Sequence, residues 1–253
     1  MRGRMIAAAA LALLPGTAWS QLAHPRAIAM LRSDATWTPV AFVCDSTDTN
    51  RIMALSPPDG TRAATLTSLS KPGLARSQVQ VHVGAADAGM NQRWYPLTDA
   101  NGRAIGHIHT VNPAMVEPGA TTPTVTAVTL GDRTSNCRFA PQTRILAATP
   151  KRSIQITRDD GGGYRYRSYD HDADLAAVEV PWGGRDTRAS LTIAGGRLIE
   201  QGDGWRGYDF ANRGYVYRVR VSVDPAHGGG GVKVWRGGHM VLDEPFAAYV
   251  AAL

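Results

Sequence analysis

The sequence lacks the local signatures of most enzyme classes. It contains no Gly-x-Ser-x-Gly nucleophile turn, no His-Glu-x-x-His zinc motif, no phosphate-binding loop and no Cys-x-x-Cys pair. Residues 68–71 (SLSK) do match Ser-x-x-Lys, but the companion motifs are missing and no helical pattern follows. We interpret this match as chance, and we expect no catalytic residues and no cofactor.

Lysine is scarce, and long basic runs are absent. Lys71, Lys151 and Lys233 are the only lysines, so most of the 27 basic residues are scattered arginines, set against 21 acidic residues. The formal net charge is +6, and it falls to about +4 if Arg2 and Arg4 are removed with a leader. Nucleic-acid-binding segments usually carry basic clusters. The charge pattern therefore predicts no nucleic-acid partner.

Long apolar runs are missing after the first twenty residues. Residues 1–20 combine a positively charged start, an apolar run over residues 5–14 and a small-x-small site at residues 18–20. This pattern is typical of a cleaved signal peptide. No later run approaches the roughly 20 residues that cross a bilayer, so no transmembrane segment is expected after cleavage. We predict a periplasmic or secreted protein.

Cysteine is limited to Cys44 and Cys137. In an oxidising compartment two such residues predict one disulfide, whereas a reactive thiol pair is disfavoured because they are far apart in sequence. Closing this loop stabilises the fold by about 4 to 5 kcal/mol at most. We expect the bond to staple a first β domain, residues 21–148, that is followed by a second domain, residues 149–253.

Helical periodicity is also scarce, and strand patterns dominate. Only residues 25–32 (PRAIAMLR) predict a short N-terminal helix, with Pro25 suited to its first turn. Elsewhere, short alternating segments are separated by Gly, Pro, Asn and Asp turns. The predicted fold is all-β, with two antiparallel sandwich or barrel units and a short N-terminal helix.

The clearest local pattern is a hairpin over residues 204–223. Its turn is Asn212-Arg213-Gly214. In the strand that follows, Tyr217 is expected to point to one face, and Arg218 and Arg220 to the other. We interpret this hairpin as the structural centre of the second domain. Its arginine face is expected to meet solvent or a partner.

Two histidines are the candidate metal ligands. His107 and His109 lie on the same face of a predicted strand, because alternate residues point the same way. A transition-metal site normally needs a third protein ligand, and the sequence does not identify one. Histidines packed among apolar neighbours are the competing interpretation.

An acidic run over residues 170–174 (DHDAD) resembles the start of a calcium-binding loop. The sixth and twelfth loop positions hold Leu175 and Pro181 instead of Gly and Glu. We therefore interpret the run as a solvated turn.

Aromatic residues on polar strands form a candidate binding surface. Exposed rings could stack on sugars or contact a protein, although aromatics are also ordinary core residues of strands. The residues expected at this surface are Trp94, Tyr95, Trp205, Tyr217, Arg218 and Arg220.

The C-terminal part resembles uncharacterised exported β-rich proteins of proteobacteria. The resemblance is carried by the strand residues 208–217, Val232–Val234, Gly237-Gly238 and residues 244–249, and by Asn136–Phe139 earlier in the chain. It implies a β-rich exported protein and no particular activity. The C-terminal hairpins are more distantly similar to periplasmic lysozyme-inhibitor barrels, from which the chain departs in having no cysteine after residue 137.

These observations predict a non-catalytic periplasmic or secreted binding or interaction module. Its expected partner is an envelope protein or a polysaccharide. Two alternatives stay open: a metal-dependent hydrolase of cell-envelope material that uses His107 and His109, and an inhibitor of a cell-wall hydrolase.

Overall fold

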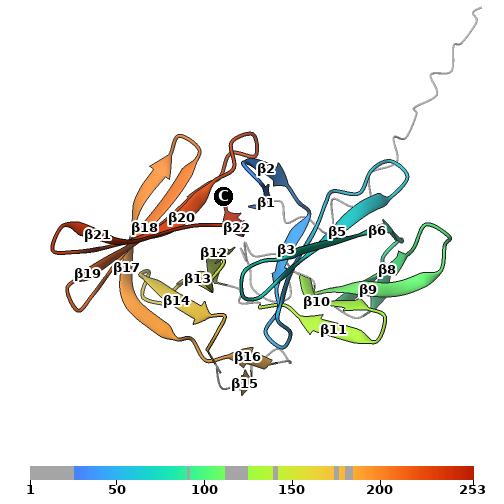
Figure 1. Ribbon diagram of the computed structural model, residues 1–253, viewed down its shortest axis with the longest axis horizontal. Helices are drawn as coiled ribbons and strands as arrows, with labels where there is room; N and C mark the ends of the chain where they lie inside the picture. Colours follow the sequence, from blue (N-terminus) through green and yellow to red (C-terminus); the bar gives the residue numbers. More distant parts are fainter. Residues whose placement is uncertain (1–25, 90–91, 112–124, 139–141, 174–176, 180–184) are drawn as a thin grey trace, which may run out of the picture.

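The protein is all-β, as the sequence predicts. The computed structural model in Figure 1 describes residues 26–89, 92–111, 125–138, 142–173, 177–179 and 185–253, and these form strands, turns and loops without a helix. The predicted signal peptide lies outside the described residues. Within those ranges, no helix is long and apolar enough to cross a bilayer.

One sheet has eleven antiparallel strands and joins the two ends of the chain. Its first strand by sequence pairs with its last, because β1 and β22 lie side by side. In spatial order the strands are β2 (Thr36–Pro39), β1 (Ala27–Ser33), β22 (Ala248–Ala252), β12 (Thr143–Ala148), β13 (Arg152–Arg158), β14 (Tyr164–Asp170), β17 (Leu191–Gly202), β18 (Trp205–Asn212), β19 (Tyr215–Ser222), β20 (Gly230–Arg236) and β21 (His239–Pro245).

The second sheet has nine antiparallel strands and lies beside the first (Figure 1). Its main path runs β11 (Arg133–Asn136), β10 (Val125–Leu130), β9 (Ala104–Val111), β8 (Gln92–Thr98), β6 (Arg76–Val83), β5 (Ala63–Ser70), β4 (Arg51–Leu55) and β3 (Phe42–Asp45), and β7 (Asp87–Gly89) pairs with β8. A separate pair, β15 (Ala177–Glu179) and β16 (Arg185–Thr187), completes the strands.

The predicted disulfide is present, and it joins the two edges of the nine-stranded sheet. Cys44 on edge strand β3 is bonded to Cys137, which directly follows edge strand β11. A β-bridge between Ser46 and Cys137 continues this contact. The sheet therefore curls until its edges meet at the disulfide.

The short N-terminal helix is the incorrect part of the predicted fold. Residues 27–33 form strand β1 instead, with Met30 in the core of the eleven-stranded sheet and Leu31 in the core between the sheets. A strand buried on both faces is apolar without strict alternation, so its pattern does not distinguish it from a helix.

A distinct apolar layer holds the two sheets together. It contains Leu31 of β1, Ala148 of β12 and Val250 of β22 on one side, and Val43 of β3 and Ile52 of β4 on the other. The predicted domain division after residue 148 stays a prediction. The strands β1, β2 and β12 precede that point in sequence and pair within the eleven-stranded sheet.

The hairpin predicted over residues 204–223 is confirmed as β18 and β19. Its turn residues Arg213 and Gly214 have φ values of 48° and 81°, the left-handed conformation that a tight hairpin turn requires. Val219 and Val221 point into the core, whereas Arg218 and Arg220 face outward. The alternation thus gives this hairpin one apolar and one polar face.

We predict that replacing both cysteines by alanine lowers the free energy of unfolding by about 2 to 5 kcal/mol. The bond closes a 93-residue separation, so its loss enlarges the unfolded ensemble. Urea unfolding of the oxidised protein and of the double variant measures the difference. Reductant should destabilise the wild type and leave the variant unchanged; equal midpoints for the oxidised wild type, the reduced wild type and the double variant would contradict the prediction.

Candidate functional site

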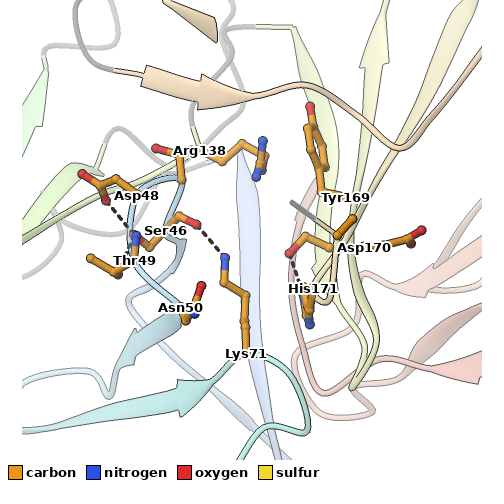
Figure 2. A pocket seen from close by; sticks show the side chains of 12 residues that line it. Ser46, Asp48, Thr49, Asn50, Lys71, Arg138, Tyr169, Asp170 and His171 are labelled. Atoms are coloured by element: carbon orange, nitrogen blue, oxygen red, sulfur yellow. Dashed lines mark hydrogen bonds between the residues drawn. The ribbon is translucent and has the colours of Figure 1, made fainter. Parts of the chain in front are cut away.

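A polar pocket with a volume of about 230 Å³ lies between the two sheets (Figure 2). From the nine-stranded sheet it is lined by the loop of residues 46–50 after β3, by Lys71 and by Arg138. Ser153 and residues 169–171 line it from the eleven-stranded sheet. The pocket therefore draws its walls from segments that are far apart in sequence.

Beneath the pocket lies a buried carboxylate that is held by two cations. Asp45 accepts a hydrogen bond from Lys71 Nζ at 2.9 Å on Oδ1 and from Arg138 Nε at 2.8 Å on Oδ2. All three side chains are less than one-tenth exposed. Burial alone would raise the pKa of Asp45, but Lys71 and Arg138 outweigh it and hold that pKa well below its usual range.

The disulfide positions this ion pair. Asp45 directly follows Cys44, and Arg138 directly follows Cys137, so the covalent bond brings the carboxylate and the guanidinium together. The backbone N–H of Arg138 also donates to the carbonyl oxygen of Asp45 at 2.7 Å. The charge contact is therefore built on the closure of the sheet.

Arg138 also connects the pocket to the opposite sheet. Its guanidinium carbon lies 3.4 Å from the centroid of the Tyr169 ring on β14. A desolvated cation over an aromatic face contributes on the order of 2 kcal/mol. Since Tyr169 is itself buried, this contact ties the eleven-stranded sheet to the charged cluster.

His171 forms the far wall of the pocket (Figure 2). Its backbone N–H donates to the Lys151 carbonyl at 2.8 Å, and its Nε2 lies 3.1 Å from Ser153 Oγ. Its Nδ1 is buried and makes no hydrogen bond in the described part of the chain. Burial, with smaller contributions from Lys71 and Arg138, lowers the pKa of His171 to about 4, and Asp45 and the backbone of Pro150 oppose this shift.

The contact between Ser153 and His171 resembles a nucleophile and its base, but its surroundings do not favour that chemistry. Ser153 is fully buried, and no described carboxylate orients His171 through Nδ1. A base with a pKa of about 4 is also weak at neutral pH. The groups of this pocket are suited to holding a polar ligand.

A second concave surface, the outer groove, crosses the outward face of strands β17 to β21. Its volume is about 530 Å³. Gly207 and Gly231 lie directly opposite Arg220 on the two neighbouring strands, so neither directly opposed position carries a side chain. A Cβ at Gly231 would lie 2.8 Å from the carbonyl oxygen of Glu244, so the approach of β21 also requires glycine there.

Two arginines in the outer groove are fixed by carboxylates and stack on tryptophans. Arg220 donates two hydrogen bonds to Glu200 at 2.7 and 2.8 Å, and its guanidinium carbon lies 4.0 Å from the Trp205 ring centroid. Arg218 forms the same bidentate contact with Asp209, with both distances 2.8 Å. Its guanidinium carbon lies 5.5 Å from the centroid of Trp235.

The charges in this groove are balanced. The third cation, Lys233, pairs with Asp243 at 3.1 Å, so Arg218, Arg220 and Lys233 each have an acidic partner. Bidentate pairing fixes the plane of a guanidinium more firmly than a single contact does. The groove therefore presents planar guanidinium groups in fixed orientations, and its positive charges are matched by negative ones.

The predicted binding surface is divided by the fold. Trp205, Arg218 and Arg220 come together in the outer groove. Tyr217 lies on the opposite face of β19, with its ring centroid 5.6 Å from that of Tyr166 in the core. Placing Tyr95 on a surface is wrong, because it is buried in the core of the nine-stranded sheet.

Trp94 lies in the other sheet, beside the predicted metal ligands. Its ring centroid is 5.0 Å from that of His109. His109 uses both ring nitrogens, with Nε2 2.7 Å from Gln92 Oε1 and Nδ1 2.6 Å from Thr126 Oγ1. His107 Nε2 lies 3.3 Å from Thr129 Oγ1.

These hydrogen bonds would have to be replaced before a metal could bind at His107 and His109. Burial, and to a lesser degree His107, lower the pKa of His109. Among the described residues, no three His, Cys, Asp or Glu side chains are grouped closely enough to hold a metal ion. The metal site stays a prediction from the sequence.

Sequence reasoning did not identify the polar pocket. Lys71 lies in a chance Ser-x-x-Lys match, and Asp170 and His171 lie in the acidic run that resembles a solvated turn; neither pattern predicts a pocket. A usable signal was the charged residue after each cysteine, Asp45 and Arg138, because a disulfide must bring these neighbours together. Trp235 of the outer groove is a further strand aromatic that the sequence alone does not distinguish from a core residue.

The fold and these two sites define a disulfide-closed all-β protein with a polar pocket between its sheets and a charge-balanced groove outside one of them. Comparison of the chain with protein-family models, with curated proteins and with solved structures finds no match. The functional argument therefore depends on the residues of the sites.

We predict that acid weakens the fold through His171. Its pKa of about 4 in the folded state is below the ordinary value of 6.5, so the unfolded chain binds more protons between these values. The free energy of unfolding should fall as pH decreases from about 6.5 towards 4, and His171→Gln should flatten this slope. Asp45 acts only at lower pH, since its own pKa is depressed.

Urea unfolding at half-unit pH steps measures the effect. The His239→Gln variant is the matched control, because His239 is exposed. A smaller slope should persist from His109, whose pKa is also lowered. Identical pH profiles for the wild type and His171→Gln would contradict the role of His171.

Proposed function

We propose that the protein is an exported, non-catalytic binding module whose outer groove holds a neutral polysaccharide. The single observation that carries this proposal is the pair of tryptophans, Trp205 and Trp235, in one groove with arginines that are anchored by carboxylates. Fixed aromatic and planar polar groups in one concavity are typical of binding sites that orient a ligand.

The chemistry of a sugar chain fits these groups. A pyranose presents a face of C–H bonds, which packs on apolar rings, and a rim of hydroxyls, which exchange hydrogen bonds with side chains. Ile199 and Pro245 add apolar surface to the groove, while Glu200 and Asp243 supply acceptors.

Charge balance favours a neutral chain over an acidic one. Each cation of the groove is already paired with a carboxylate, so a polyanion would have to displace those partners. Nucleic acids and acidic polymers bind chiefly through unpaired basic residues. A neutral polysaccharide needs no such displacement.

Export is supported by two independent features. The disulfide between Cys44 and Cys137 indicates an oxidising compartment, since such bonds are rare in the cytosol. The N-terminal sequence has the pattern of a signal peptide. Together they favour the periplasm or the cell exterior, where envelope polysaccharides are found.

A protein partner is the second candidate. Strand β21 lies at the edge of the eleven-stranded sheet, and its Met240 and Val241 are 53% and 56% exposed. Exposed edge strands can pair with a strand of another protein. Capture of a cell-wall hydrolase from periplasmic extract by the wild type and not by Val241→Lys would favour this inhibitor function.

We predict that Trp205→Ala and Trp235→Ala each weaken polysaccharide binding about 30-fold or more. This corresponds to the loss of about 2 kcal/mol that is typical when a central aromatic anchor is truncated. Affinity electrophoresis in gels that contain soluble neutral glucans measures retardation, and tryptophan fluorescence titration measures affinity.

The control is Trp94→Ala, which removes a tryptophan from the other sheet and should bind as the wild type does. Circular dichroism establishes that each variant is folded. The proposal fails if no neutral polysaccharide retards the wild type, or if the two groove variants bind as tightly as Trp94→Ala.

A further inference from the structure

Four planar side chains of the outer groove form one row over three neighbouring strands. Trp205 lies on β18, the arginines Arg220 and Arg218 lie on β19, and Trp235 lies on β20. The guanidinium carbon of Arg220 is 4.0 Å from the centroid of the Trp205 ring, and that of Arg218 is 5.5 Å from the centroid of Trp235. The row therefore begins and ends with a tryptophan and has the two arginines between them.

The register of the strands gives the length of this row. Trp205 is paired with Ser222 of β19, and Trp235 is paired with Val216 of the same strand. These two partners are six residues apart, which corresponds to about 20 Å along the strand. The tryptophans are also two strands apart, which adds about 10 Å across the sheet. Each ring stacks towards an arginine between them, so the rings are closer to each other than their backbones are.

The row is accessible from solvent and is fixed by its acidic partners. The side chains of Arg218 and Arg220 are 45% and 46% exposed, and both tryptophans are half-buried. Bidentate contacts with Asp209 and Glu200 hold the planes of the two guanidinium groups. A chain that lies along the row meets groups that are already oriented, which lowers the entropic cost of binding.

The row also has no sharp bend. Pairing is continuous between β18 and β19 and between β19 and β20, without a register shift. The extent of the row along the strands is about twice its extent across them, so the row mainly follows extended backbone. A straight row of planar groups matches an extended β-linked glucan, whereas an α-linked glucan curves into a helix and leaves such a row.

We propose that the outer groove binds an extended, β-linked stretch within a neutral polysaccharide, and that this stretch spans about three sugar residues or more. Trp205 and Trp235 then contact different sugar residues of the same chain. This inference rests on the proposed function and adds the length and the shape of the ligand. Once one tryptophan is engaged, contact with the other is intramolecular, so a ligand that reaches both gains affinity. A disaccharide is too short to reach both.

Isothermal titration calorimetry with cello-oligosaccharides of two to six residues tests the length of the site. For the wild type, we expect affinity to rise about tenfold or more from the disaccharide to the tetrasaccharide and then to level off, because both anchors are occupied. Malto-oligosaccharides of the same lengths test the shape of the ligand. We expect them to bind about fivefold or more weakly than their β-linked counterparts, since their curvature keeps them from the second tryptophan.

Single-tryptophan variants test whether one chain engages both anchors. Trp205→Ala and Trp235→Ala should each bind the tetrasaccharide about as weakly as the disaccharide, because each variant keeps one anchor only. The matched control is Trp94→Ala, which keeps both anchors and should retain the full dependence on length. Circular dichroism establishes that the variants are folded. The titrations of the wild type stand on their own if a groove variant does not fold.

The inference is overturned if the wild type binds the disaccharide as tightly as the hexasaccharide, or if malto-oligosaccharides match cello-oligosaccharides of equal length. It is also overturned if both groove variants retain the dependence on length. In these cases the proposed function still stands when soluble neutral glucans retard the wild type in affinity gels. If no neutral glucan, polymeric or oligomeric, binds the wild type, the proposed function fails and this inference fails with it.

Discussion

A carboxylate without water is unstable unless cations and donors replace its hydration, and the side chain of Asp45 is only 2% exposed. Lys71, which follows β5, and Arg138, which lies just after β11, supply the two cations. Removing one partner of a buried pair typically costs about 3 to 5 kcal/mol. The closure of the nine-stranded sheet therefore depends on all three groups together.

The junction of the two sheets is reinforced by apolar contacts from both ends of the chain. β1 pairs with β22, and both contribute to the layer that packs against β3 and β4. Neither terminal strand could bury its two faces without the other sheet. The charged cluster and the disulfide thus close the nine-stranded sheet, and this apolar layer packs that sheet against the other.

Local features were predictable from the sequence, and features that depend on distant partners were not. The hairpin over residues 204–223 was predictable because its turn and alternation lie within twenty residues. Strand β1 was predicted as a helix because its partner β22 is at the other end of the chain. The disulfide joins residues that are far apart in sequence, but it was predictable because only two cysteines were available to pair.

The same contrast between local features and features that depend on distant partners applies to the candidate sites. Alternation in β19 placed Arg218 and Arg220 on one face, and Tyr217 shares the parity of the core residues Val219 and Val221, which was a signal for its burial. The polar pocket had no such signal, because Lys71, Arg138 and His171 meet only after both sheets have formed.

The outer groove and the polar pocket also differ in how strongly their geometry depends on the relative position of the two sheets. The outer groove lies on consecutive strands, and its geometry follows from neighbouring backbone pairings within one sheet. The polar pocket lies where the sheets meet, so anything that shifts one sheet against the other alters the distance between Lys71 and His171. A ligand held there would therefore be sensitive to the relative position of the two sheets, whereas a ligand held in the outer groove would contact one sheet alone.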